Sequence, residues 1–397
     1  MKQNRRTFLK TTALTAAATL ASPLLASSKS TAGEDYKALV CVMLEGGADT
    51  ANMLVPKHDL GAYLEYAKLR PKTAHNREQI RTLKESAYGF HPAMSRMQRL
   101  YNYGNLAVVA NVGTLNRTLS KREIAKARSV EDISDAPQQL FSHVQQRELL
   151  MQAGEESKGW AARFADAFGT AEKLNVSVGG YNTMQEGGKQ EALIAHDDIF
   201  GTHPMMQKVR SAQVDTFFDI DESTEGKSLG EQLQLVLDLI EHRKKGAFPK
   251  RQIFFVSHGG WDLHEGENAR FDHQVAHLDK SMGEFYRALE RLGLDKKVTT
   301  FTLSDFGRSI YNDGADHGWG GHAFVMGGAV QSGIYGKMPQ LAHKSSDTLA
   351  NGAIIPTLSV ESYLAPMVAW LGDGKVDPKQ IFPKLAAFES KPLQFLA

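Results

Sequence analysis

One apolar run, Lys37-Ala-Leu-Val-Cys-Val-Met-Leu44, sets the class of this fold. A continuous run of β-forming residues predicts a strand buried on both faces, as in a parallel sheet covered by helices. The run leads directly into Glu45-Gly-Gly-Ala-Asp49-Thr-Ala-Asn52. Open α/β sheets bind ligands beyond the carboxyl ends of their strands, so two glycines and an acid here predict part of a functional site. The simpler alternative is a turn into a helix, with Asp49 as its N-cap.

The same pattern recurs along the chain as an amphipathic helix followed by an apolar strand. The predicted helices span residues 93–102, 229–242 and 274–292, and the strands after them are Leu106–Ala110, Gln252–Ser257 and Val298–Leu303. This alternation predicts an α/β fold with a doubly wound, mostly parallel sheet and helices on both faces. We expect one domain over residues 33–397, with polar, aperiodic insertions near residues 115–138 and 181–225.

The beginning of the chain has the composition of an export signal. Residues 1–28 hold four basic residues and no acid, and Arg5-Arg6-Thr7-Phe8-Leu9-Lys10 contains a twin-arginine core. This pattern predicts a Tat signal peptide in residues 1–32, and therefore a periplasmic or otherwise exported protein that meets the Tat translocase. The run from Thr11 to Ala26 is too short and too polar for a stable membrane anchor.

The composition excludes several classes of function. The formal charge is +1, and no basic stretch interleaved with aromatic residues occurs, so we expect no nucleic-acid partner. A single cysteine excludes an intramolecular disulfide framework and the Cys-based zinc motifs. Cys41 lies inside the first apolar run, and we predict that it is a buried strand residue.

Loops rich in acids and histidines follow two of the predicted strands. Asp262 and His264 are two residues apart, so in an extended segment they project to the same side and could bind one metal ion. Because neighbouring parallel strands end at the same edge of a sheet, the loops are expected to converge there. The candidate ligands are Asp49, Asp262, His264, Asp305, Asp316, His317 and His322. They suit one or two divalent ions, which could be zinc, manganese, calcium or magnesium.

A set of motifs carries a resemblance to a known family. They are Gly46-Gly-Ala-Asp49-Thr-Ala-Asn52, Phe90-His91-Pro92-Ala93, Leu106-Ala-Val-Val109, Phe141-Ser142-His143-Val-Gln-Gln146, Gly159-Trp160, Gly259-Gly-Trp-Asp262-Leu-His264, Ser304-Asp305-Phe-Gly-Arg308, Asp316-His317-Gly-Trp-Gly-Gly-His322, Gly327-Gly328 and Ile334-Tyr-Gly336. In this order they resemble the bacterial family called domain of unknown function 1501. Its members carry Tat signals and belong to the alkaline phosphatase and sulfatase clan.

The resemblance implies an alkaline phosphatase-like fold and a metal site. Clan members use one or two divalent metals, a strand-end Asp and a Ser, Thr or modified Cys nucleophile at a helix start. The strand-end Asp falls on Asp49, and an Asp/His pair falls on Asp262 and His264 at a shorter spacing than the clan's commoner one. Where clan hydrolases have Asp-His, this chain has Asp305-Phe306, so an imidazole is missing that His317 could supply.

Other residues are candidates for the chemical step. Ser142 opens a predicted helix over residues 143–153, where the helix N-terminus favours an alkoxide and an anionic substrate. The alternative is that Ser142 is the N-cap alone, and Thr50 is another possible nucleophile. Arg308 could pair with a sulfate or phosphate, or be tied to a core carboxylate. His143 or His258 could act as general acid/base.

These observations predict an enzyme, an exported metal-dependent hydrolase of phosphate or sulfate esters whose substrate is a small anionic ester. Ser142 would attack or position the ester while Arg308 steadies the anion. The alternative function is a non-catalytic periplasmic binding or assembly protein that retains the fold, with or without a metal.

Overall fold

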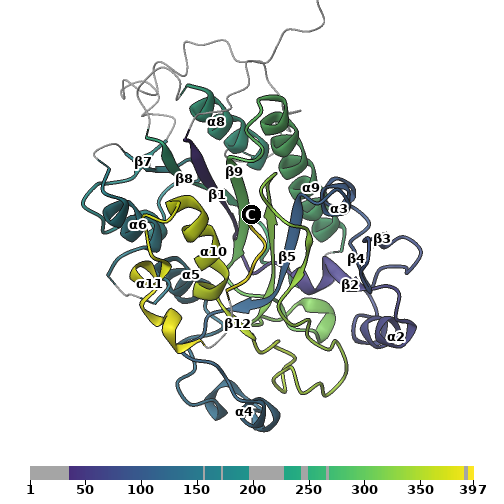
Figure 1. The fold of residues 1–397 in the computed structure, drawn as a ribbon. Coiled ribbons are helices and arrows are strands. Elements are labelled where there is room, and N and C mark those ends of the chain that lie inside the picture. Colours follow the sequence, from purple (N-terminus) through teal and green to yellow (C-terminus); the bar gives the residue numbers. More distant parts are fainter. Residues whose placement is uncertain are drawn as a thin grey trace, which may run out of the picture. The chain divides into compact units, whose positions relative to one another are not determined.

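A mixed, mostly parallel sheet forms the centre of the molecule (Figure 1), and its strand order is β11-β5-β10-β9-β1-β8-β6-β7, with β12 beside β5. Its strands are β1 Lys37–Leu44, β5 Leu106–Gly113, β6 Asn175–Ser177, β7 Leu193–Ile194, β8 Arg251–His258, β9 Val298–Ser304, β10 Gly321–Met326, β11 Gly333–Tyr335 and β12 Leu358–Ser359. Strand β10 pairs antiparallel with β5 and β9, and the other pairs are parallel. The predicted α/β class and mostly parallel sheet are confirmed.

The computed structural model describes residues 35–154, 157–170, 173–195, 228–242, 249–264, 268–388 and 392–397. Residues 35–397 form one compact unit. The predicted signal peptide, residues 1–32, lies outside the described residues, as does most of the predicted insertion near residues 181–225. No helix in the described part of the chain has the length and apolar character needed to cross a bilayer.

Alternate residues of β1 enter two separate cores because successive side chains of a strand point to opposite faces. Val40 and Val42 belong to the core packed by α3 Ser95–Asn102, α8 Leu229–His242 and α9 Asn268–Arg291. Leu39 and Cys41 belong to the core packed by α5 His143–Gln152, α6 Trp160–Phe168 and α10 Val360–Gly372. Helices therefore cover both faces of the sheet, as the continuous apolar run predicts (Figure 1).

Smaller elements surround the sheet. A three-stranded antiparallel sheet is built from β2 Leu54–Pro56, β3 Arg81–Thr82 and β4 Tyr88–Phe90. The remaining α-helices are α2 Leu60–Leu69, α4 Lys121–Lys126 and α11 Pro378–Ile381. The short 3-10 helices are η1 Thr50–Asn52, η2 Val130–Asp132, η3 Thr183–Gln185, η6 Asn312–Gly314 and η7 Pro383–Ala387. The predicted insertion near residues 115–138 contains α4 and η2.

The register of the central strands decides where the loops meet. Leu44 at the end of β1 pairs with His258 at the end of β8 and with Ser304 at the end of β9. All three strands run parallel, so the loops that follow them leave the sheet at the same edge. This edge carries the candidate site.

Candidate metal centre

The loops after β1 and β8 touch backbone to backbone. Gly46 has φ +112°, and a Cβ there would lie 2.3 Å from the backbone nitrogen of Asp262. Glycine is required for both reasons, since L side chains rarely adopt this conformation and no space exists for one. Gly47, with φ +74°, is equally confined, because its Cβ would lie 2.4 Å from the Phe306 ring. Gly46 therefore lets the loop holding Asp262 lie close to the end of β1, and Gly47 leaves room for the Phe306 ring.

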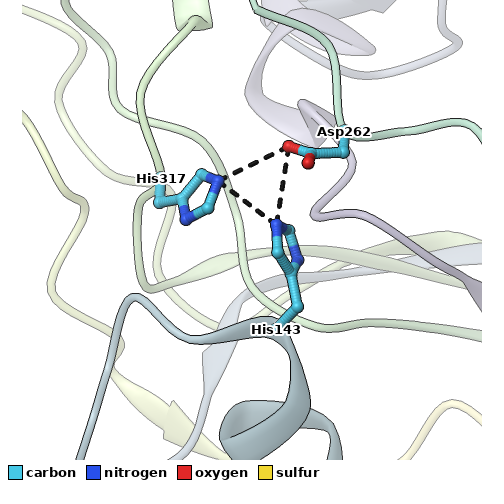
Figure 2. Close-up of side chains that lie close together, drawn as sticks. All are labelled: His143, Asp262 and His317. Atoms are coloured by element: carbon cyan, nitrogen blue, oxygen red, sulfur yellow. Dashed lines mark hydrogen bonds and ion pairs between the residues drawn. The ribbon is translucent and has the colours of Figure 1, made fainter.

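Three side chains from three segments converge at this edge (Figure 2). His143 is the first residue of α5, Asp262 follows β8, and His317 follows β9. His143 Nε2 lies 3.2 Å from His317 Nε2 and 3.5 Å from Asp262 Oδ1. His317 Nε2 lies 3.4 Å from the same Asp262 oxygen. Imidazole and carboxylate ligands in this number could hold a metal ion.

The second ring nitrogen of each histidine determines where the ring protons sit. His143 Nδ1 lies 2.7 Å from Asp305 Oδ2, and His317 Nδ1 lies 2.8 Å from the Phe141 carbonyl oxygen. A carboxylate and a carbonyl only accept hydrogen bonds, so both Nδ1 atoms are donors. In the neutral rings both Nε2 atoms are then unprotonated, and their lone pairs face each other and Asp262. Such an arrangement is repulsive unless a cation lies between these three ligand atoms.

The spacing of the three ligand atoms fits a small ion with tetrahedral coordination. Nitrogen and oxygen ligands at about 2.0–2.1 Å from zinc would lie roughly 3.3–3.4 Å from one another in tetrahedral geometry. The three distances, 3.2, 3.4 and 3.5 Å, agree with this value. Three protein ligands leave a fourth position for water or substrate, which is typical of catalytic zinc sites.

Asp305 lies behind His143 and holds it in place. Its side chain is fully buried and accepts hydrogen bonds from His143 Nδ1, from the Gly46 backbone N–H at 2.9 Å and from Arg147 Nε at 3.1 Å. A carboxylate that accepts the outer proton of a ligating imidazole fixes the tautomer and the ring orientation. The structure thus gives Asp305 direct contact with a candidate ligand, His143.

Arg308 ties the loops of the site together. It is 1% exposed, and its Nε and Nη2 donate to the carbonyl oxygens of Gly47 and Gly46, each at 2.7 Å. The same Nη2 lies 2.6 Å from Asp262 Oδ1, and Nη1 donates to the Ala315 carbonyl. Of the two alternatives for Arg308, the structure shows the one in which it is tied to a carboxylate.

The charge of Asp262 follows from these neighbours. Partial burial would raise the pKa of Asp262, but the hydrogen bond and charge of Arg308, with smaller contributions from His143 and His264, lower it to about 2. Asp262 is therefore a carboxylate at neutral pH. His264 Nε2 lies 2.8 Å from Asp262 Oδ1, and the His264 side chain is 56% exposed. His264 thus lies next to Asp262, on the solvent side of the three candidate ligands.

Three other predicted ligands lie outside the cluster of His143, Asp262 and His317. Asp49 is buried and forms a two-pronged ion pair with Arg70 of the segment after α2. Asp316 is exposed and accepts from Asn312 Nδ2 at 3.4 Å. His322 is buried, its Nδ1 accepts the Asn111 backbone N–H, and desolvation lowers its pKa to about 4.

Two residues predicted for the chemical step also have other partners. His258 is buried, its Nε2 lies 3.1 Å from His277 Nδ1, and burial together with the nearby His277 lowers its pKa to about 3. Ser142 is the N-cap of α5, where its Oγ accepts the Gln145 N–H at 3.4 Å. Ser142 therefore occupies the capping position, and its role as a nucleophile stays a prediction.

Sequence reasoning did not identify Arg147, Glu45 or Arg70. Arg147 lies four residues after His143 on α5, so helical periodicity places both on one face and could have revealed it. Its guanidinium contacts Asp305 and lies 3.4 Å from Glu45 Oε1. The partner of Asp49, Arg70, lies on a different element, and no local pattern marks it.

Comparisons with known proteins place the chain in context. Among solved structures, it is similar to a protein in the alkaline phosphatase superfamily from Vibrio parahaemolyticus, with 14% identity, a TM-score of 0.40 and coverage of 77% of this chain and 64% of the other. It is also similar to the lipoteichoic acid synthase LtaP from Listeria monocytogenes, with 11% identity, a TM-score of 0.37 and coverage of 84% and 72%. It is similar as well to the Streptococcus pyogenes phosphoglycerol transferase GacH in complex with sn-glycerol-1-phosphate, with 11% identity, a TM-score of 0.38 and coverage of 88% of this chain and 77% of the other.

No curated protein matches the sequence. The sequence model of the family described as "Protein of unknown function (DUF1501)" matches residues 241–360, which contain Asp262, Asp305, Arg308 and His317. This match, over residues 241–360, confirms the resemblance that the motifs predict.

Proposed function

We propose that this protein is a metal-dependent hydrolase of phosphate or sulfate esters that is exported by the Tat pathway. One observation carries the proposal: His143 Nε2, His317 Nε2 and Asp262 Oδ1 lie within 3.5 Å of one another. A resident cation explains why three such donors lie so close together. The twin-arginine motif at Arg5-Arg6 supports export after folding, when a metal would already be bound.

His143, Asp262 and His317 would hold a single divalent ion. Two imidazoles and one carboxylate at this spacing suit zinc better than calcium or magnesium, which prefer more oxygen ligands. When bound, the ion supplies Lewis-acid chemistry, by polarising an ester oxygen or lowering the pKa of water. We favour one ion over two because the carboxylate of Asp49 is already neutralised by Arg70.

The chain's own residues orient this group. Asp305 keeps the proton of His143 on Nδ1, and Arg308 holds Asp262 Oδ1 toward the two imidazoles. The Phe306 ring packs against the rings of His143 and His317, at centroid distances of 4.6 and 4.8 Å, and excludes water from that side.

His264 is the better placed acid/base. Its Nε2 lies 2.8 Å from Asp262 Oδ1, and its side chain is 56% exposed, so the ring is open to solvent beside the candidate ligands. The ring of His258 is buried against His277 and has less access to a substrate. We therefore assign proton transfer to His264 rather than to His258.

A second candidate function is a binding or assembly protein that holds the metal without turnover. Phe306 favours it, because an apolar ring packs on both imidazoles where clan hydrolases are expected to have a further imidazole ligand. Both functions need an ion held by His143, Asp262 and His317, but only the hydrolase turns over a substrate.

Metal content and turnover test the proposal together. Protein purified without a His-tag is analysed by elemental mass spectrometry and assayed on aryl phosphate, phosphodiester and aryl sulfate substrates. Asp262→Ala removes the central donor, and Asp316→Ala is a matched control because Asp316 is an exposed acid in a neighbouring loop. We expect about one divalent ion per chain and turnover in the wild type and the control, and neither in Asp262→Ala. Metal without turnover selects the binding protein, and the absence of stoichiometric metal refutes both.

A further inference from the structure

Arg147 is a partly exposed cation that contacts Asp305, the carboxylate behind His143. Its Nε and Nη2 point at Asp305, at 3.1 and 3.4 Å, and Asp305 Oδ2 also contacts His143 Nδ1. The third guanidinium nitrogen, Nη1, lies 3.4 Å from Glu45 Oε1, a distance longer than a normal charged hydrogen bond. The Arg147 and Glu45 side chains are 33% and 30% exposed. Arg147 is thus anchored to Asp305 by two of its nitrogens, and its side chain as a whole is partly exposed.

The other arginine of the site cannot take this role. Arg308 is 1% exposed, and its donors are directed at four backbone carbonyls and Asp262. An oxyanion could reach Arg308 only by displacing these buried bonds, which is costly. Nη1 of Arg147 can reach an oxyanion by displacing one long contact with a carboxylate that is 30% exposed.

The formal charges at this edge nearly balance. Glu45, Asp262 and Asp305 contribute three negative charges, and Arg147 and Arg308 contribute two positive ones. A divalent cation held by the three donors would leave an excess of one positive charge. A ligand with one negative charge neutralises this excess. A ligand with two negative charges exceeds it by one, and the carboxylate of Glu45 repels the second charge.

Resting on the proposed function, we infer that Arg147 is the substrate-binding residue for the oxyanion of the ester, and that Glu45 restricts the bound group to a single negative charge. The ligand is a tetrahedral oxyanion with at least one esterified oxygen. Sulfate monoesters and phosphodiesters carry one charge and fit this description, whereas phosphate monoesters carry nearly two at pH 8.

Direct binding of small stable esters tests the inference without relying on turnover. Isothermal titration calorimetry at pH 8 on zinc-loaded protein compares methyl sulfate and dimethyl phosphate, which are singly charged, with methyl phosphate. The first two probes also distinguish a sulfur from a phosphorus substrate. Arg147→Gln removes the cation, and Glu45→Gln removes the competing carboxylate while keeping its size. Elemental analysis of each variant reports the metal content separately.

The wild type is expected to bind one or both singly charged probes more tightly than methyl phosphate. Arg147→Gln is expected to weaken that binding about tenfold, because a charge-assisted hydrogen bond is lost. Glu45→Gln is expected to tighten methyl phosphate about two- to fivefold and the other probes less. If Arg147→Gln fails to fold because Asp305 has lost this ion pair, Glu45→Gln still tests the inference.

Three results would overturn the inference. Arg147→Gln could bind the probes as well as the wild type, Glu45→Gln could leave methyl phosphate binding unchanged, or the wild type could bind zinc and none of the three probes. In each case the metal site of the proposed function still stands. A wild type that binds no stoichiometric metal refutes the proposed function instead, and with it the charge balance on which this inference rests.

Discussion

His143 Nδ1 lies 2.7 Å from Asp305 Oδ2, and this contact decides which nitrogen of His143 faces Asp262 and His317. Asp305 is fully buried and also accepts the Gly46 N–H, so its own position is fixed by the backbone at the end of β1. The structure therefore links the first strand to the candidate metal ligands His143, Asp262 and His317 through one carboxylate.

Replacing Asp305 with Asn should weaken metal binding without removing a donor from the group. The neutral amide no longer stabilises the proton on His143 Nδ1, so the imidazole loses basicity and orientation. Changes of this kind typically lower metal affinity about 10- to 100-fold. Competition with a chelating dye measures the zinc dissociation constant. Asp316→Asn is the control, since Asp316 is exposed and contacts Asn312. Equal affinities for Asp305→Asn and the wild type would show that Asp305 does not position His143.

The close approach of two loops makes a second prediction, at Gly46. Gly46 and Gly104 have similar backbone angles, φ +112° and +95°, but a Cβ would touch the Asp262 backbone at Gly46 and meets nothing within 4 Å at Gly104. Gly104→Ala should cost only the conformational strain, about 1–2 kcal/mol. Gly46→Ala should lower the free energy of unfolding further and also weaken metal binding, because Asp262 must move. Urea denaturation and the same chelator competition measure the two effects. Similar losses in both variants would show that the contact with Asp262 is unimportant.

The sequence predicts the sheet better than the site because the two depend on different kinds of information. Strand β1 and helix α8 begin and end where the apolar patterns place them, since burial acts on every residue of a run. Helix α9 begins at Asn268, six residues before the predicted start at Gln274, because its first turns carry polar residues that the apolar pattern does not include.

At the site, the sequence identifies the residue types but not their partners. His143, Asp262 and His317 are all among the residues predicted for the site, and they do meet. Asp49 has the same strand-end position as Asp262, yet it pairs with Arg70, a cation from a distant segment. Long-range pairing of this kind depends on the packing of whole elements and leaves no mark in local spacing.

The hydroxyl of Ser142 should be dispensable for turnover, because the structure places it at the N-cap of α5. Ser142→Ala is expected to lower the free energy of unfolding by about 1 kcal/mol through loss of the cap. Ser142→Asn supplies another good cap without a hydroxyl and should restore that stability. Both variants should retain the metal and turn over substrate within a few-fold of the wild type. Loss of turnover by several orders of magnitude in both variants would identify Ser142 as the nucleophile.

The last prediction concerns stability in acid and rests on His322. Burial lowers the pKa of His322 to about 4, whereas an unfolded histidine has a pKa of about 6.5. Between these values the unfolded chain binds more protons than the folded one, so the contribution of His322 to stability is complete above pH 6.5 and is lost as the pH falls toward 4.

Urea unfolding at pH 7.5 and pH 5.0, with EDTA present so that metal release does not contribute, measures this loss. Replacing His322 with Gln removes the titrating group, and the decrease in stability between the two pH values should become smaller by about 1–2 kcal/mol. A cavity or a lost hydrogen bond in the variant lowers stability equally at both pH values and so does not change this difference. His343→Gln is the control, because His343 is exposed, and it should retain the wild-type decrease. If His322→Gln loses as much stability in acid as the wild type, His322 does not take up a proton on unfolding and its burial is not the source of the acid sensitivity.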